Sequence, residues 1–398
     1  MKIKLMNIVD TILLLLIIIK TNSIYLNIGL DNKLNFFFVF ITIIAVFLEI
    51  ITSQLSFYYF KKMLMVVAIY FFVIISNIVV SLSSLSLNSL LHYFVIAPLL
   101  FVLIMYKYHN KVLIDFVSIF VNLVIVLAVV SLLFWLFGSV LKMIHPTTYV
   151  VNNWSGGRIT ASYHNLYFET QSTSFLGTRI IRNSGIFAEA PMWSLVLSVA
   201  LIFQGLLLTP NTKRFIFLVF TILTTASTTG FFIVGLLMIY IVTNQKRSLF
   251  KYFSLTIIPV LIYALAIAWG EKSDTSSANI RFDDYISGFL AWKNSFIFGS
   301  GLTEGLRVIE SYMDTTIRHN LGYSNSFFII LAQGGLVLGI YYFYPVIRIL
   351  FSKNFSRNSK MFAFLFLMLL FTAIFTETPL FLVLVGMFYG LILNRENA

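Results

Sequence analysis

Residues 112–137 read VLIDFVSIFVNLVIVLAVVSLLFWLF, with Asp115 as the one charged residue among them. A helix that crosses the hydrocarbon core of a bilayer needs about 20 predominantly apolar residues. This stretch therefore predicts a transmembrane helix. Similar apolar stretches recur along the chain, at residues 5–28, 36–58, 63–82, 90–106, 191–209, 215–243, 250–270, 324–344, 361–376 and 379–394.

The overall composition also favours a membrane protein over a soluble one. Of the 398 residues, 59% are hydrophobic and 11% are charged, whereas soluble domains carry about 25% charged residues. A single core in a chain of this size could not bury so much apolar surface. Because cysteine is absent, disulfides, thiolate nucleophiles and cysteine-ligated metal sites are excluded. We predict an all-α polytopic membrane protein in which residues 1–398 form a single integral membrane domain.

The positions of the lysines and arginines predict the topology. Cationic loops between transmembrane helices stay on the cytoplasmic side. This rule places both termini in the cytoplasm and leaves two long external loops, residues 138–190 and 271–323. The cytoplasmic clusters are Lys2/Lys4, Lys61/Lys62, Lys107/Lys111, Lys213/Arg214, Lys246/Arg247/Lys251 and Arg348/Lys353/Arg357/Lys360. Because they hold more than half of the lysines and arginines behind the net charge of +12, we expect no nucleic-acid partner.

The apolar stretch 215–243 is interpreted as a helical hairpin. As one helix its roughly 29 residues would extend ~43 Å, which exceeds the hydrocarbon core, and a single crossing would place a cationic cluster outside. The polar sequence TTASTTG lies at its centre, at residues 224–230. We predict two short helices joined by a turn that is buried in the protein. The total is then about twelve transmembrane segments.

The two predicted external loops contain six arginines that the topology rule does not require: Arg158, Arg179, Arg182, Arg281, Arg307 and Arg318. Guanidinium groups bind phosphate through paired hydrogen bonds and stay charged at any accessible pH. Several arginines that face a bilayer, in a chain without thiols, would be suited to bind the diphosphate of a lipid carrier. The alternative is that they are solvated or paired with the carboxylates of Glu169, Glu189, Asp283 and Asp284.

Residues 281–296 have the apolar spacing of a helix. Phe282, Ile286, Phe289 and Phe296 fall on one face. With Trp292, this pattern predicts an amphipathic helix that lies on the outer membrane surface. Such a helix would hold Arg281 at the height of the lipid headgroups; the alternative is a membrane-hugging helix without a further role.

The segment before residue 191 combines structural and unexplained features. Pro191 suits the first turn of the following helix, and Glu189 favours the positive end of that helix. These roles leave Arg182 and Gly185 unexplained. Elsewhere, Glu49 lies within an apolar span, where a carboxylate must face water, the bundle or a partner. The sequence has no phosphate-binding glycine loop with lysine, no HExxH, no G-x-S-x-G and no metal-ligand spacing.

Four segments between residues 180 and 345 together resemble the Wzy-type polysaccharide polymerase and O-antigen ligase superfamily of bacterial membranes. They are RNSGIFAEAP at 182–191, similar to R-x-x-G-x-F-x-E; TTASTTG at 224–230, similar to T-x-S-R-x-G with Thr228 in place of arginine; Arg281 and its helix followed by GSGL at 299–302; and YSNSFF at 323–328 followed by GGLVLG at 334–339. The last is similar to H-N-x-x-L and G-L-x-G, with Ser324 in place of the ligase-like histidine.

The resemblance implies glycan transfer on the outer face of the bacterial cytoplasmic membrane, with no metal and no other cofactor. The donor is a glycan on undecaprenyl diphosphate, and the acceptor is another lipid-linked repeat unit of a capsule, O-antigen or exopolysaccharide. The implied partners are these lipid-linked oligosaccharides, membrane lipid, a chain-length regulator and a flippase. Ser324 favours the polymerase branch. An O-antigen ligase-like transferase and a lipid-linked oligosaccharide flippase are the alternatives.

This reaction assigns roles to the loop residues. Charge that develops on the departing diphosphate needs preplaced cations, and we assign Arg182 and Arg281 to it. The acceptor hydroxyl needs a group that orients or deprotonates it, for which Glu189 and His319 are the candidates. The predicted substrate-binding residues are Arg179, Arg318, Gly185, Ser324 and Asn325.

Overall fold

The computed structural model describes residues 2–52, 55–82, 85–175, 178–244, 259, 276–318 and 322–395. The chain forms two compact units. Unit 1 contains Met1–Val9, Phe37–Leu113 and Lys272–Ala398, and unit 2 contains Asp10–Phe36 and Ile114–Glu271.

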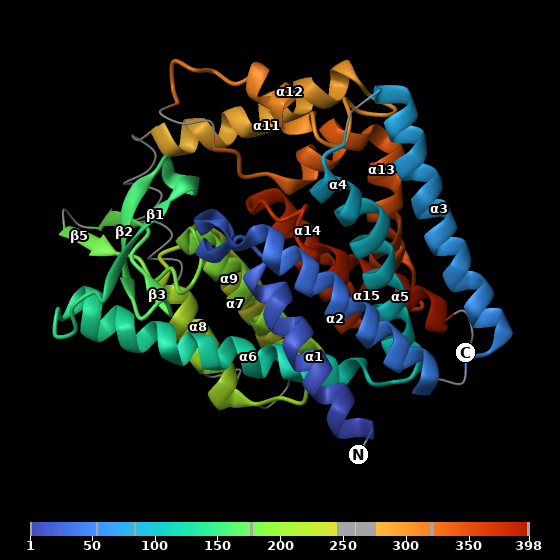
Figure 1. Ribbon diagram of the computed structural model, residues 1–398, viewed down its shortest axis with the longest axis horizontal. Coiled ribbons are helices and arrows are strands. Elements are labelled where there is room, and N and C mark those ends of the chain that lie inside the picture. The colour runs from blue at the N-terminus through green and yellow to red at the C-terminus, as the bar shows by residue number, and fades with distance from the viewer. Residues whose placement is uncertain are drawn as a thin grey trace. The chain divides into compact units, whose positions relative to one another are not determined.

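Unit 1 is built from helices. In it α5 packs along α15, and α13 packs on α11, α12 and α14. Figure 1 shows α11 and α12 running across the end of α13 rather than parallel to it. The helices of unit 1 are α3 (Phe57–Ser81), α4 (Leu87–Leu91), η2 (His92–Ile96), α5 (Ala97–His109), α11 (Ser276–Asn294), α12 (Gly305–Ser311), α13 (Ser326–Phe351), α14 (Arg357–Thr372) and α15 (Pro379–Arg395).

Unit 2 combines helices with two small sheets. Two further helices, α1 (Lys2–Ile19) and α2 (Asp31–Thr52), contribute residues to both units. The helices of unit 2 are η1 (Leu26–Leu30), α6 (Leu113–Phe134), η3 (Trp135–Val140), η4 (Asn153–Ser155), α7 (Ala190–Leu206), α8 (Thr212–Thr224) and α9 (Thr228–Asn244).

The described helices confirm a mostly helical, multi-pass membrane protein. Five helical stretches are long and apolar enough to cross a bilayer: Leu26–Thr52, Phe57–Ser81, Leu87–His109, Leu113–Val140 and Ser326–Phe351. Shorter apolar helices add Leu5–Ile19, Ala190–Leu206, Thr228–Asn244 and Pro379–Arg395. The total of twelve segments and the cytoplasmic termini stay predictions, and the predicted span 250–270 lies, apart from Pro259, outside the described residues.

The predicted hairpin within residues 215–243 is confirmed. α8 and α9 are separated by three residues, and Ala226 between them has a left-handed backbone (φ 47°). A Cβ added at Gly230 would lie 2.6 Å from the Ile222 side chain. Because Ile222 and Gly230 are equally far in sequence from Ala226 and lie close together, the chain reverses direction at Ala226. The turn is buried, because Thr225 and Ser227 are 0% and 3% exposed.

The expectation of an all-α protein missed two small antiparallel sheets in the loop 138–190. One has the order β1 (Thr148–Asn152), β2 (Arg158–Tyr163) and β3 (Tyr167–Phe168), and the other pairs β4 (Ser172–Phe175) with β5 (Thr178–Ile181). These strands have two to six residues, which is too short for alternation of apolar and polar residues to stand out in a polar loop.

α13 is broken at Gly335, where the backbone (φ 59°, ψ −155°) leaves the helical region. The loop that follows α11 fills this break with backbone hydrogen bonds, so the third and fourth family-like segments meet through their main chains. The bonds run from the N–H groups of Ser300, Gly301, Leu336 and Val337 to the carbonyls of Ala332, Gln333, Phe296 and Ile297, at 2.8–3.1 Å.

A second irregularity of α13 is compensated by a side chain of α15. Pro345 lies inside the helix and has no N–H to donate to the carbonyl of Tyr341. The hydroxyl of Tyr389 donates to that carbonyl instead, at 2.6 Å. Buried main-chain oxygens are costly without a donor, so this bond joins α15 to α13 where the helix would otherwise be weakest.

Glu49 is a partnered structural carboxylate, which is one of the alternatives that the sequence left open. Its Oε1 lies 2.7 Å from the Lys107 ammonium, and Asn110 donates to its Oε2 at 2.9 Å. Both side chains of the ion pair are 1% exposed. The pair therefore joins α2 to α5 without leaving a lone charge in the bundle.

Candidate active site

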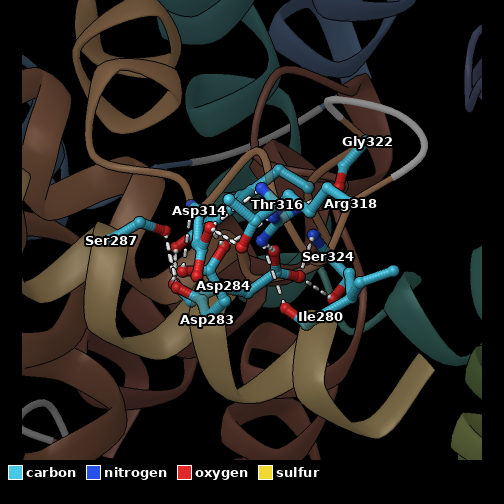
Figure 2. A network of polar contacts seen from close by, with 10 residues as sticks. Ile280, Asp283, Asp284, Ser287, Asp314, Thr316, Arg318, Gly322 and Ser324 are labelled. Atoms are coloured by element: carbon cyan, nitrogen blue, oxygen red, sulfur yellow. Dashed lines mark hydrogen bonds and ion pairs between the residues drawn. The ribbon is translucent and has the colours of Figure 1, made fainter. Parts of the chain in front are cut away.

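A buried ionic network in unit 1 fixes α11 against the start of α13 (Figure 2). The Arg318 guanidinium donates through Nε to Asp283 Oδ2 at 2.5 Å and through Nη2 to Asp284. It also donates to the main-chain carbonyls of Gly322 (3.0 Å) and Ile280 (3.1 Å). The side chain is 1% exposed. The sequence left open whether Arg318 pairs with Asp283 and Asp284, and the structure shows that it does.

The charge balance of this network works against a phosphate ligand at Arg318. One guanidinium faces two carboxylates, so the group is anionic as a whole. Burial raises the pKa of the Asp284 carboxyl, whereas the Arg318 guanidinium and the donors of Ser324 oppose this rise. All three guanidinium nitrogens already donate to protein oxygens. Arg318 is therefore suited to hold α11 in place.

Ser324 and Asn325 connect the network to α13. Asp284 Oδ2 accepts from the Ser324 hydroxyl (2.6 Å) and from the Ser324 N–H (3.1 Å). Asn325 caps α13 by accepting from the Phe328 N–H at 3.1 Å. Its amide nitrogen is buried and has no hydrogen-bond partner among the residues that the structure describes. The hydrogen bonds of Ser324 therefore stabilise the fold, and the side-chain amide of Asn325 keeps an N–H group that can donate to another group.

The amphipathic helix predicted over residues 281–296 is confirmed for residues 281–294, but its polar and apolar faces are inverted relative to a soluble helix. Asp283 and Asp284 are buried. Phe282 is 68% exposed, and Ile286 and Phe289 are 43% and 46% exposed. Arg281 is exposed on the same helix. An exposed apolar face of this kind fits lipid better than water, and its position on the outer membrane surface stays a prediction.

Sequence reasoning missed Glu377, which lies between α14 and α15. Its Oε1 accepts from the Gln333 amide at 2.8 Å, next to the break in α13. Desolvation of the carboxyl by the protein around it raises its pKa, against the opposing effect of the Gln333 hydrogen bond, although the residue as a whole is exposed. The available signal was a lone carboxylate in TETP, the turn between two short apolar spans.

Glu377 and Arg281 belong to the same end of unit 1. The Tyr285 hydroxyl, one helical turn after Arg281, donates to the carbonyl of Phe371 at 2.9 Å. The Ser326 hydroxyl, at the start of α13, accepts from the Phe375 N–H at 2.9 Å. The end of α14 is therefore attached to α11, and the α14–α15 turn that carries Glu377 is attached to α13.

In unit 2, Arg182 stabilises the buried turn between α8 and α9. Its Nε donates to the Thr225 carbonyl at 2.8 Å, and its Nη1 donates to Gln171 Oε1 at 3.2 Å. The neighbouring Asn183 donates to the main-chain and side-chain oxygens of Thr224, both at 3.0 Å. The first two family-like segments thus meet, and the half-buried Arg182 guanidinium is held in a fixed position.

Gly185 and Glu189 have local structural roles. Gly185 has φ 55°, and a Cβ there would approach the Trp193 ring to 3.2 Å, so glycine suits this turn. Pro191 lies in the first turn of α7, as predicted, and Glu189 immediately precedes that helix. The Glu189 carboxylate accepts from the Trp154 indole N–H at 2.8 Å and does not cap the helix with its own side chain.

The structure describes some of the other predicted residues only in part. Arg179 belongs to β5, but its side chain lies outside the described residues, as does all of His319. Arg158 is exposed, and Arg307 forms an exposed ion pair with Glu304 at 2.9 Å. Arg182 belongs to unit 2 and Arg281 to unit 1. Within the described part of the chain, no group of three or more His, Asp or Glu side chains could hold a metal ion.

The comparison with protein families identifies one match. Residues 214–343 match the family model described as O-antigen ligase. The match covers about a third of the chain and includes α9, α11, α12 and most of α8 and α13. This match confirms the expected resemblance to the O-antigen ligase superfamily. A comparison with curated proteins found no matching relative.

Proposed function

We propose that this membrane protein polymerises undecaprenyl-diphosphate-linked oligosaccharide repeat units on the outer face of the bacterial cytoplasmic membrane. The family match supports a membrane enzyme that processes lipid-linked glycans. Ser324, which donates to Asp284 in the place of a ligase-like histidine, favours polymerisation within that group.

The observation that carries the proposal is the position of Arg281 on α11. The helix is fixed by the Arg318 network on one face and exposes apolar side chains on the other. If that apolar face lies in lipid, the Arg281 guanidinium stands at the headgroup level, where the diphosphate of a lipid carrier also lies. A preplaced cation there stabilises the negative charge that develops as the diphosphate leaves.

Glu377 is our candidate for the proton acceptor. In the proposed step, the acceptor hydroxyl oxygen forms a bond to the anomeric carbon of the donor glycan. The bond from that carbon to the diphosphate oxygen breaks, and its electron pair leaves with the lipid diphosphate. The hydroxyl proton passes to the Glu377 carboxylate, whose raised pKa brings it closer to the pH at which a base works best.

Arg182 of unit 2 stays a candidate for diphosphate binding. Its Nε and Nη1 are engaged by protein oxygens, which fixes the direction of the guanidinium and leaves its positive charge in place. It would then contribute to diphosphate binding mainly through its charge. Glu189 and His319 stay second candidates for contacts with the acceptor.

Replacing Arg281 with alanine is expected to lower glycan transfer by about 10²- to 10³-fold, the size of effect seen when one preplaced donor is removed from a developing anion. Chain growth should be measured with reconstituted protein and lipid-linked repeat units. Arg307→Ala is the matched control, because Arg307 is an exposed arginine of the same unit whose partner is Glu304. Normal polymer from the Arg281 variant would remove our assignment of the diphosphate site.

Replacing Glu377 with glutamine is expected to remove the acidic limb of the pH profile. In the native protein, transfer should fall as the pH drops through the Glu377 pKa, because the base becomes protonated; that pKa lies above the ordinary value of 4.5. The glutamine variant should be slow at every pH and lack this limb. Glu310→Gln in α12 should behave like the native protein, and an unchanged limb in the Glu377 variant would contradict the assignment.

A ligase-like activity is the second candidate, because the matching family model carries that description. The two reactions differ in their acceptor. Protein supplied with lipid-linked repeat units alone should form polymer if it is a polymerase, whereas a ligase needs a different acceptor. In a deletion strain, loss of a polymerase leaves single repeat units on lipid outside, whereas loss of a flippase strands them inside.

A further inference from the structure

The β1–β2 hairpin of unit 2 has an exposed apolar face and a buried polar face. Val151 and Ile159 lie directly opposite each other in the register and are 54% and 69% exposed. Tyr149, two residues before Val151, is 67% exposed. On the other face, Thr160 and Asn152 are 2% and 0% exposed. A sheet in water has the opposite arrangement, so this face is suited to an apolar surrounding.

The exposed face continues the lipid-facing surface of a membrane span. Residues 113–140 form a candidate span, on which Leu133 and Val140 are 51% and 46% exposed. The connection that follows contains Leu141 and Met143, which are 51% and 69% exposed, and it leads to β1, which begins at Thr148. Figure 1 shows the hairpin close to the end of α6. Exposed apolar side chains therefore occur on the span, in the connection and on the sheet, with the exposed Lys142 and His145 between them.

The charges around this surface match a lipid headgroup region. Lys142 and Arg158 are both exposed, the first in the connection from the span to β1 and the second at the start of β2. Aromatic side chains such as Tyr149 are enriched where apolar and aqueous regions of a membrane meet. Cations together with an apolar face are typical of segments that lie in the membrane interface.

We propose that the β1–β2 hairpin lies in the membrane interface, with Tyr149, Val151 and Ile159 in the lipid and with Lys142 and Arg158 among the headgroup phosphates. Trp154 in the connection between the strands donates to Glu189 at the start of α7. A hairpin held by lipid would therefore also fix the height of α7 relative to the membrane surface.

Spin labels on single introduced cysteines test this proposal, because the native chain contains no cysteine. Val151→Cys and Ile159→Cys are labelled in the full chain, reconstituted in phospholipid nanodiscs. Collisions are measured with oxygen, which concentrates in lipid, and with a water-soluble nickel chelate. Leu133→Cys on α6 is the lipid reference, and Asn354→Cys, exposed in the polar turn between α13 and α14, is the water reference.

We expect the labels at 151 and 159 to resemble the label at 133, with collisions with oxygen several-fold more frequent than with nickel. Labels that resemble the label at position 354 would show that the face is in water and would overturn the proposal. Labels shielded from both agents would also overturn it, because a second copy or another protein would then cover the face. A single symmetric elution peak for each variant shows that the cysteine has not unfolded the protein.

Discussion

Replacing Arg318 with methionine should destabilise the protein by about 3–5 kcal/mol, because it leaves buried carboxylates without their cation. Asp283 and Asp284 have side-chain exposures of 10% and 2%, so water cannot replace the guanidinium. α11 should then separate from the start of α13, and glycan transfer should be lost together with the position of Arg281. The free energy of unfolding can be measured by denaturant titration in detergent.

Two companion variants separate this structural role from substrate binding. Arg307→Met removes an exposed ion pair and should cost less than about 1 kcal/mol. Adding Asp283→Asn and Asp284→Asn to Arg318→Met removes the uncompensated charge and should restore much of the lost stability. An Arg318→Met protein as stable as Arg307→Met, yet inactive, would contradict our interpretation and identify Arg318 as a substrate ligand.

Replacing Gly335 with alanine should prevent folding. Its backbone region is essentially restricted to glycine, and a residue with a side chain there costs about 1–3 kcal/mol from strain alone. A Cβ at this position would also lie 2.3 Å from the carbonyl carbon and oxygen of Ile297. Relief of that contact requires the loop after α11 to leave the break in α13, with loss of the four main-chain bonds between them.

Gly235 provides the matched control for this substitution. It lies within α9, and a Cβ there would meet no atom within 4 Å. Gly235→Ala should leave the fold intact and stabilise the helix by about 0.5–1 kcal/mol. The yield of monodisperse protein from membranes compares the two variants. Similar yields would mean that Gly335 does not require its special backbone geometry.

The apolar spans, the helical hairpin at residues 215–243 and the exposed face of α11 could all be predicted from the sequence. Each of these features depends on local rules: the thickness of lipid sets a minimum helix length, and helical spacing places residues on one face. The short strands within 148–181 escaped prediction, since their pairing depends on contacts across turns rather than on a long periodic pattern.

The chain composition and the spacing of apolar residues by themselves determined a helical membrane protein with two arginine-bearing loops. This is because each membrane-spanning segment has to meet the length and apolarity requirements of lipid within its own sequence. Tertiary structure alone decided what each charged side chain does. As residue types, Arg318 and Arg281 are equally good phosphate ligands. In the structure Arg318 is paired with Asp283 and Asp284, whereas Arg281 is exposed. Glu377 accepts a hydrogen bond from Gln333, which lies far away in the chain. Electrostatic energy depends on distances between atoms, and only the folded chain sets those distances.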